Sequence, residues 1–177
     1  MKATVLHLCI LATLYLPCQR AAADAAVDER AMKAAYLYNF TLFAQWPSLP
    51  DTDFQFCVLG STSLDEELTR LEGKRAQNGK PITIRRIAPN GSLTGCLVVY
   101  IDEHSHRTFD ALLQQLAATP VLTITDSTGL ADRGIMIEMR RQGPRIVFDV
   151  NLAAARKANI DFSARLLKLA SFVAYRS

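Results

Sequence analysis

The chain has 177 residues, half of them apolar, and its 20 Lys and Arg against 17 Asp and Glu give a net charge of +3. This is the size of one ordinary domain with a proper core, and it leaves no room for a second domain. Its basic residues are scattered and mixed with acids, whereas binding to nucleic acid phosphates needs clustered positive charge. Length, composition and charge therefore exclude a disordered chain and a nucleic-acid-binding protein.

The first 23 residues have the pattern of a cleavable secretion signal. Lys2 gives a positive start, an apolar run follows, and Ala21-Ala22-Ala23 supplies the small residues of a cleavage site. The apolar run, 3–16, has 14 residues, fewer than the roughly 20 that a membrane-spanning helix needs. We therefore predict a signal peptide over 1–23, a mature domain over 24–177 and export from the cytoplasm. Loss of the signal leaves 18 basic and 17 acidic residues, a net charge of +1.

Cleavage also removes Cys9 and Cys18, so that Cys57 and Cys96 remain as an even pair in an exported domain. A disulfide between them is the favoured interpretation, and two free buried thiols are the alternative. Closing a loop of 39 residues stabilises a fold by roughly 4 kcal/mol in the chain-entropy model. Neither cysteine has a histidine or a further cysteine at ligand spacing, so no metal site is predicted.

The first element of the mature domain is a predicted helix. The stretch 28–45 contains neither Gly nor Pro, and Pro47 disfavours the helical conformation in Trp46, so the helix is expected to end at Trp46. Tyr36, Phe40 and Phe43 lie on one apolar stripe, and Trp46 widens it. The helix is more apolar than a surface helix needs to be.

Six strand-like runs follow, at 54–59, 82–87, 96–101, 121–125, 135–140 and 145–150, with helical patterns at 63–71, 107–118, 152–158 and 163–175. The run 96–101 is apolar without alternation, as in a strand that is covered on both faces. The short turn between the last two strands is typical of an antiparallel hairpin. We expect an α/β fold, a single-domain three-layer sandwich with a mostly parallel mixed sheet of about six strands and helices on both faces.

Polar residues follow two of these strands. Residues 102–106, Asp-Glu-His-Ser-His, come after a central strand, at the edge where α/β sheets usually bind ligands. They suit a general base or a metal ligand, but also a loop that caps the next helix. Residues 60–63, Gly-Ser-Thr-Ser, offer amides to an anion but lack the lysine of a phosphate-binding loop. Structural loops are the favoured interpretation, so no catalytic residue, metal or cofactor is predicted.

Several segments together resemble the YfiR-like family of periplasmic proteins. The segments are Met-Lys-Ala-Ala-Tyr-Leu-Tyr-Asn-Phe at 32–40 with Phe43 and Trp46-Pro47 after it, and then 56–60, 124–126, 134–137 and Phe-Asp-Val-Asn-Leu-Ala-Ala-Ala at 148–155. They occur in the order of the family and cover nearly all of the mature domain. Cys57 and Cys96 match one disulfide of the family, while a second pair has no counterpart here.

The resemblance implies a non-enzymatic periplasmic regulator. Such a protein restrains a membrane-bound diguanylate cyclase, YfiN, by binding its periplasmic sensor region, and the outer-membrane lipoprotein YfiB promotes its release. Cyclic-di-GMP output and biofilm formation would then be controlled from the periplasm. A binding role fits the nearly neutral charge of the mature domain and its lack of a convincing catalytic constellation.

Two groups of residues are candidates for the partner surface. Aromatic side chains dominate interface energies when they are buried by a partner, although in this chain they are equally suited to the core. Basic side chains on the polar side of the last helix suit a partner's acids, or else a solvated face. The candidates are Tyr36, Phe40, Phe43, Trp46, Arg165 and Lys168. A small-ligand binding module and a hydrolase that uses residues 102–106 are the alternatives to the inhibitor, and a homodimer is compatible with a binding role.

Overall fold

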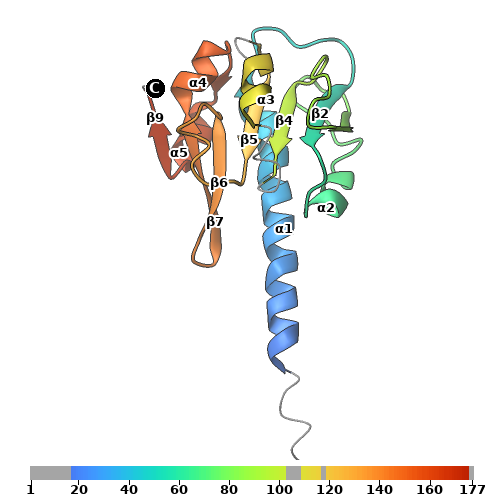
Figure 1. Ribbon diagram of the computed structural model, residues 1–177, viewed down its shortest axis with the longest axis vertical. Coiled ribbons are helices and arrows are strands. Elements are labelled where there is room, and N and C mark those ends of the chain that lie inside the picture. The colour runs from blue at the N-terminus through green and yellow to red at the C-terminus, as the bar shows by residue number, and fades with distance from the viewer. Residues whose placement is uncertain (1–16, 103–108, 117–118, 176–177) are drawn as a thin grey trace, which may run out of the picture.

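The computed structural model describes residues 17–102, 109–116 and 119–175, and its centre is a seven-stranded sheet (Figure 1). The strand order is β3-β2-β4-β5-β6-β7-β9. Neighbouring strands are parallel, except for the antiparallel pair β6 and β7. The mostly parallel mixed sheet of the α/β prediction is confirmed, with seven strands in place of six.

The elements of this fold are short apart from the first helix. The strands of the sheet are β2 (Phe54–Leu59), β3 (Ile82–Ile87), β4 (Val98–Ile101), β5 (Leu122–Thr125), β6 (Ile137–Gln142), β7 (Arg145–Asn151) and β9 (Phe172–Ala174). The helices are α1 (Pro17–Phe43), α2 (Asp65–Thr69), α3 (Phe109–Leu116), α4 (Leu152–Lys157) and α5 (Ala164–Leu169). A second, two-stranded sheet pairs β1 (Ala44–Gln45) with β8 (Asp161–Phe162) in antiparallel fashion.

The two faces of the large sheet bury separate apolar clusters because side chains alternate along each strand. On one face, Phe56 and Val58 of β2 share a cluster with Leu37 and Phe40 of α1. On the other face, the neighbouring residues of β2 and β4 share a cluster with Leu112 of α3. The strands are thus covered on both sides, which explains their continuous apolar runs. Figure 1 shows α1 against the sheet with its N-terminal part projecting past the strand ends.

The first helix ends earlier than Pro47 alone predicts. It stops at Phe43, and Ala44 and Gln45 leave the helix to pair with β8. Ala44 is fully buried there, and the Ser163 amide donates to the carbonyl of Phe43 at 3.0 Å. The prediction that the helix reaches Trp46 is therefore wrong, because Ala44 and Gln45 pair with the distant strand β8 instead of continuing the helix.

The predicted helix over 163–175 is wrong in its second half. Helix α5 ends at Leu169, Ala170 is extended, and residues 172–174 form β9, which runs parallel to β7. The amide of Ser171 donates to the carbonyl of Phe148 at 2.8 Å and begins this pairing. Aromatic and β-branched residues such as Phe172 and Val173 favour a strand over a helix when a sheet edge is available.

Candidate partner-binding surface and disulfide

Two of the four aromatic candidates hold α1 to the sheet. The rings of Tyr36 and Phe40 lie 5.6 and 5.1 Å from the ring of Phe148 on β7, measured between centroids. The Tyr36 hydroxyl donates to the carbonyl of Ile146 at 3.2 Å. Phe40 is fully buried, so a partner could contact it only if α1 left the sheet. This burial favours a core role for Phe40.

The other two aromatic candidates lie nearer the surface. Trp46 is half-buried, and its ring meets that of Phe54 edge to face with centroids 5.4 Å apart. Phe43 is also half-buried, and the Arg165 guanidinium carbon lies 5.5 Å from the centre of its ring. This cation–π contact joins one aromatic candidate to one basic candidate. Phe43 and Arg165 therefore belong to one patch, which Phe40 does not reach.

The end of the described chain exposes large apolar side chains. Leu169, Phe172 and Tyr175 are 66%, 61% and 63% exposed, and they are the large apolar residues so exposed among those described. Exposed apolar side chains that gather in one short segment of a chain are candidates for an interaction site. Among the described strands β9 is the last one of the sheet, so no described strand pairs with its outer edge, and such an edge can bind another chain.

The predicted basic residues adjoin this apolar segment. Arg165 and Lys168 are exposed on α5, directly before Leu169 in the chain. We call Arg165, Lys168, Leu169, Phe172 and Tyr175 together the C-terminal surface. Its apolar members were not predicted, because a helix was expected over the whole of 163–175. The aromatic and β-branched pair at 172–173 was the signal in the sequence that could have indicated a strand.

The loops that follow β2 and β4 meet at one edge of the sheet. The Thr62 hydroxyl donates to the Asp102 carboxylate at 2.7 Å, and Asp102 is fully buried. The two polar loops of the sequence analysis are thus brought together, as a buried structural hydrogen bond. His104 and His106 lie outside the described residues. Within the described ranges, no three His, Cys, Asp or Glu side chains come close enough to hold a metal ion.

A partly buried ion pair joins α1 to the same edge. The Lys33 ammonium lies 2.9 Å from Asp126, just after β5, and 3.2 Å from Glu29 on its own helix. Burial lowers the pKa of Lys33, but hydrogen bonds and charge from Asp126 and Glu29 outweigh it, so the pKa is raised. Burial, with the neighbouring Asp126 carboxylate, raises the pKa of Tyr100 and keeps its phenol protonated. The raised pKa keeps Lys33 charged, which suits a structural anchor for α1.

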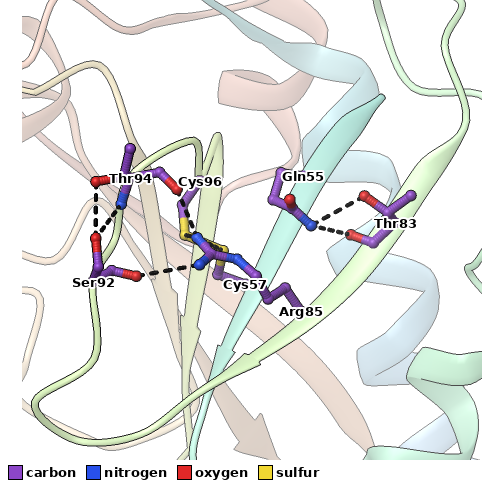
Figure 2. Close-up of a disulfide and its surroundings, with 7 residues drawn as sticks. All are labelled: Gln55, Cys57, Thr83, Arg85, Ser92, Thr94 and Cys96. Atoms are coloured by element: carbon purple, nitrogen blue, oxygen red, sulfur yellow. Dashed lines mark hydrogen bonds between the residues drawn. A yellow bond between two sulfur atoms is a disulfide. The ribbon is translucent and has the colours of Figure 1, made fainter. Parts of the chain in front are cut away.

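The structure confirms the predicted disulfide. Cys57 on β2 and Cys96, just before β4, are joined with their Cα atoms 5.8 Å apart, and both are buried. Arg85 on β3 pairs in register with Cys57 and lies beside the sulfurs (Figure 2). Its Nη2 is 3.0 Å from Cys96 Sγ and 3.4 Å from Cys57 Sγ. Sequence reasoning missed Arg85, because only the strand register brings it to the disulfide.

A mostly parallel sheet, a buried disulfide and an exposed apolar end define a small cross-linked α/β domain with the features of a binding protein. A family model described as YfiR/HmsC-like matches residues 30–171, and the chain belongs to this family. The family consists of periplasmic regulators of diguanylate cyclase signalling and is regulatory rather than catalytic. Over the described ranges, no helix has both the length and the apolar character needed to cross a membrane.

Proposed function

We propose that this protein binds the periplasmic sensor region of an inner-membrane diguanylate cyclase of the YfiN kind and inhibits the enzyme. Cyclic-di-GMP and biofilm formation would fall when it is bound, and an outer-membrane lipoprotein of the YfiB kind would release it. Export with cleavage near Ala23 is part of the proposal. Family membership supports the general class, and the exposed C-terminal surface is the observation that carries the proposal.

The C-terminal surface has the composition of a contact site. Full burial of a Leu or Phe side chain contributes about 1.5–3 kcal/mol, and Leu169, Phe172 and Tyr175 each have more than half of their surface still to bury. Arg165 and Lys168 beside them favour an acidic and apolar partner segment over a basic one. The open edge of β9 adds backbone groups that an extended segment can pair with. These features support binding to another protein chain.

The test compares acidic substitutions at the two ends of the sheet. We expect Leu169→Asp with Phe172→Asp to raise cyclic-di-GMP in cells to the level of a deletion strain, because two carboxylates replace the apolar contact. Ala88→Asp is the matched control, since Ala88 is exposed just after β3 at the opposite edge. It should leave cyclic-di-GMP unchanged. Unaltered cyclic-di-GMP in the deletion strain itself would overturn the inhibitor proposal.

A direct binding assay checks the surface separately. The purified mature protein and its Asp variants are titrated with the isolated periplasmic region of the cyclase, and affinity is measured by calorimetry. We expect the double variant to bind at least tenfold more weakly than Ala88→Asp at equal thermal stability. Equal affinities would show that another face binds, and loss of a dimer in the double variant would assign the surface to self-association.

Binding of a small ligand is a second candidate, favoured by a cleft of about 500 Å³. This volume lies within the range of ligand pockets. Apolar side chains of α3, of α4 and of the segment before β6 line it, and they include Leu113, Leu116, Met136 and Ala154. The charged residues Asp132, Arg133 and Lys157 line it as well. Native mass spectrometry of protein purified from cells would reveal a retained ligand, and Met136→Trp should then abolish its retention.

A further inference from the structure

The side chain of Arg85 makes an unusual set of contacts at the disulfide. Its Nη2 donates to both sulfurs, at 3.0 Å to Cys96 and 3.4 Å to Cys57, and also to the carbonyl of Thr94 at 2.8 Å. Nη1 donates to the carbonyl of Ser92 at 3.4 Å (Figure 2). The guanidinium therefore lies over the sulfurs and is held there by the loop that leads to Cys96.

This placement is poorly matched to a closed disulfide. A disulfide sulfur is neutral and a weak acceptor, whereas a guanidinium is permanently charged and carries five donors. The Nε of Arg85 is buried without a hydrogen-bond partner among the described residues. Arg85 is half-buried, and its charge gains little from a neutral sulfur, whereas the same charge beside a thiolate makes a strong pair. The contacts of Arg85 thus match the opened bond better than the closed one.

The remaining surroundings of the sulfurs are apolar. Cys57 and Cys96 belong to the cluster on the α3 face of the sheet, whose other described members are aliphatic side chains such as Leu59, Val99 and Leu112. Of the described charged side chains, Arg85 is the one with a contact to the sulfurs. Arg86 points to the other side of β3, where it pairs with Asp65. An apolar environment disfavours a thiolate, so the cation beside it decides how stable the thiolate is.

We propose that Arg85 is a positioning residue for thiol–disulfide exchange at Cys57–Cys96, where it stabilises the thiolate that leaves when the bond opens. Because both cysteines are buried, exchange begins when the structure around them opens locally. A low-molecular-weight thiolate of the glutathione kind then attacks one sulfur and forms a mixed disulfide. The Cys57–Cys96 bond breaks, and its electron pair leaves on the other sulfur. Cys96 Sγ, the closer to Nη2, is the favoured leaving group. A second thiol releases the mixed disulfide, so that two thiols supply two electrons and the protein dithiol gains two protons.

The test uses three variants of the oxidised mature protein in glutathione buffers, with the reduced fraction counted by thiol alkylation and mass spectrometry. Arg85→Gln keeps a donor but removes the charge, Arg85→Lys keeps the charge, and Arg86→Gln is the control on the other face of β3. The loss of one opposite charge at hydrogen-bond distance raises a thiol pKa by about one unit, from about 7.5 to the ordinary value of about 8.5. We therefore expect the equilibrium constant for reduction to fall about threefold at pH 8 in Arg85→Gln, and by close to tenfold above pH 9. Arg85→Lys should retain most of the wild-type value, and Arg86→Gln all of it.

The pH dependence separates a charge effect from a purely structural one. Only the thiolate, and not the neutral thiol, gains from the guanidinium, so the ratio of wild type to Arg85→Gln should approach one at pH 6 and grow toward pH 9. A ratio independent of pH, or equal values for Arg85→Gln and Arg86→Gln, would overturn the proposal.

A measurement on the wild-type protein covers the case in which Arg85→Gln does not fold. In the reduced protein, Cys96 should be alkylated by iodoacetamide at lower pH than the same cysteine in urea. Identical pH profiles in the two states would refute the role of Arg85. This inference does not depend on the cyclase partner, since both experiments use the isolated protein.

Discussion

Removing the link between Cys57 and Cys96 should lower the free energy of unfolding by about 4 kcal/mol. The disulfide closes a loop with a sequence separation of 39. In the chain-entropy model, a loop of that length restricts the unfolded chain by about 13 cal/mol/K, or about 4 kcal/mol at 25 °C. The perturbation is the double variant Cys57→Ala with Cys96→Ala, and the assay is equilibrium unfolding in urea, compared with the oxidised wild type.

The reduced wild-type protein and the midpoint of thermal unfolding give two further tests of this prediction. The reduced wild-type protein releases the same loop, so its stability should agree with that of the double variant to within about 1 kcal/mol. The midpoint of thermal unfolding should fall by roughly 8–16 °C for a domain of this size. A loss below about 1 kcal/mol, with the wild type shown to be fully oxidised, would refute the reasoning that the cross-link acts mainly on the unfolded chain.

Three further predictions concern the packing of the helices. Phe40→Ala should destabilise the protein by about 3–5 kcal/mol in urea unfolding, because it empties a fully buried site between α1 and Phe148, and a loss below 1 kcal/mol would contradict the core role. Because the pKa of Lys33 is raised above 10.5, its stabilising charge is present below that pH and is lost as the pH rises through the folded pKa. The stability difference between wild type and Lys33→Met should therefore shrink above pH 10.5, and a constant difference would exclude the ion pair as its source. Asn151→Ala should cost about 0.5–2 kcal/mol, since the Asn151 side chain accepts from the Ala154 amide at 2.8 Å at the start of α4. Asn151→Asp should recover only part of the loss, because a carboxylate keeps this cap but cannot donate to the Ala131 carbonyl as the amide does at 2.8 Å.

Several strands were predictable because their signal is local. Runs of apolar and β-branched residues define β2 and β3 with the same bounds in sequence and structure. The hairpin between β6 and β7 follows from a short turn with Gly143 and Pro144. The disulfide was predictable because Cys57 and Cys96 are the two cysteines that remain after the predicted cleavage of the signal. In each case the residues that carry the information lie within or beside the element.

The missed features depend on contacts between distant segments. Ala44 is not part of α1 because it pairs with β8. Strand β9 forms because the edge of β7 is available for pairing. Arg85 reaches Cys57 through the register of β2 and β3, which no single segment encodes. Long-range packing also decides which side chains are exposed: Phe40 of the aromatic stripe is buried in the structure, whereas Leu169, Phe172 and Tyr175 are exposed on α5 and beyond.

The order of the strands separates the disulfide from the C-terminal surface. Cys57 lies on β2, and five steps between neighbouring strands lead from β2 to β9, about 24 Å at 4.8 Å per strand. Figure 1 shows these two ends on opposite sides of the molecule. Thiol chemistry at one end can influence a partner at the other only through a shift of the whole sheet and its helices. Any such coupling is reciprocal, so a bound partner would change the ease of reduction by the factor by which reduction changes its affinity.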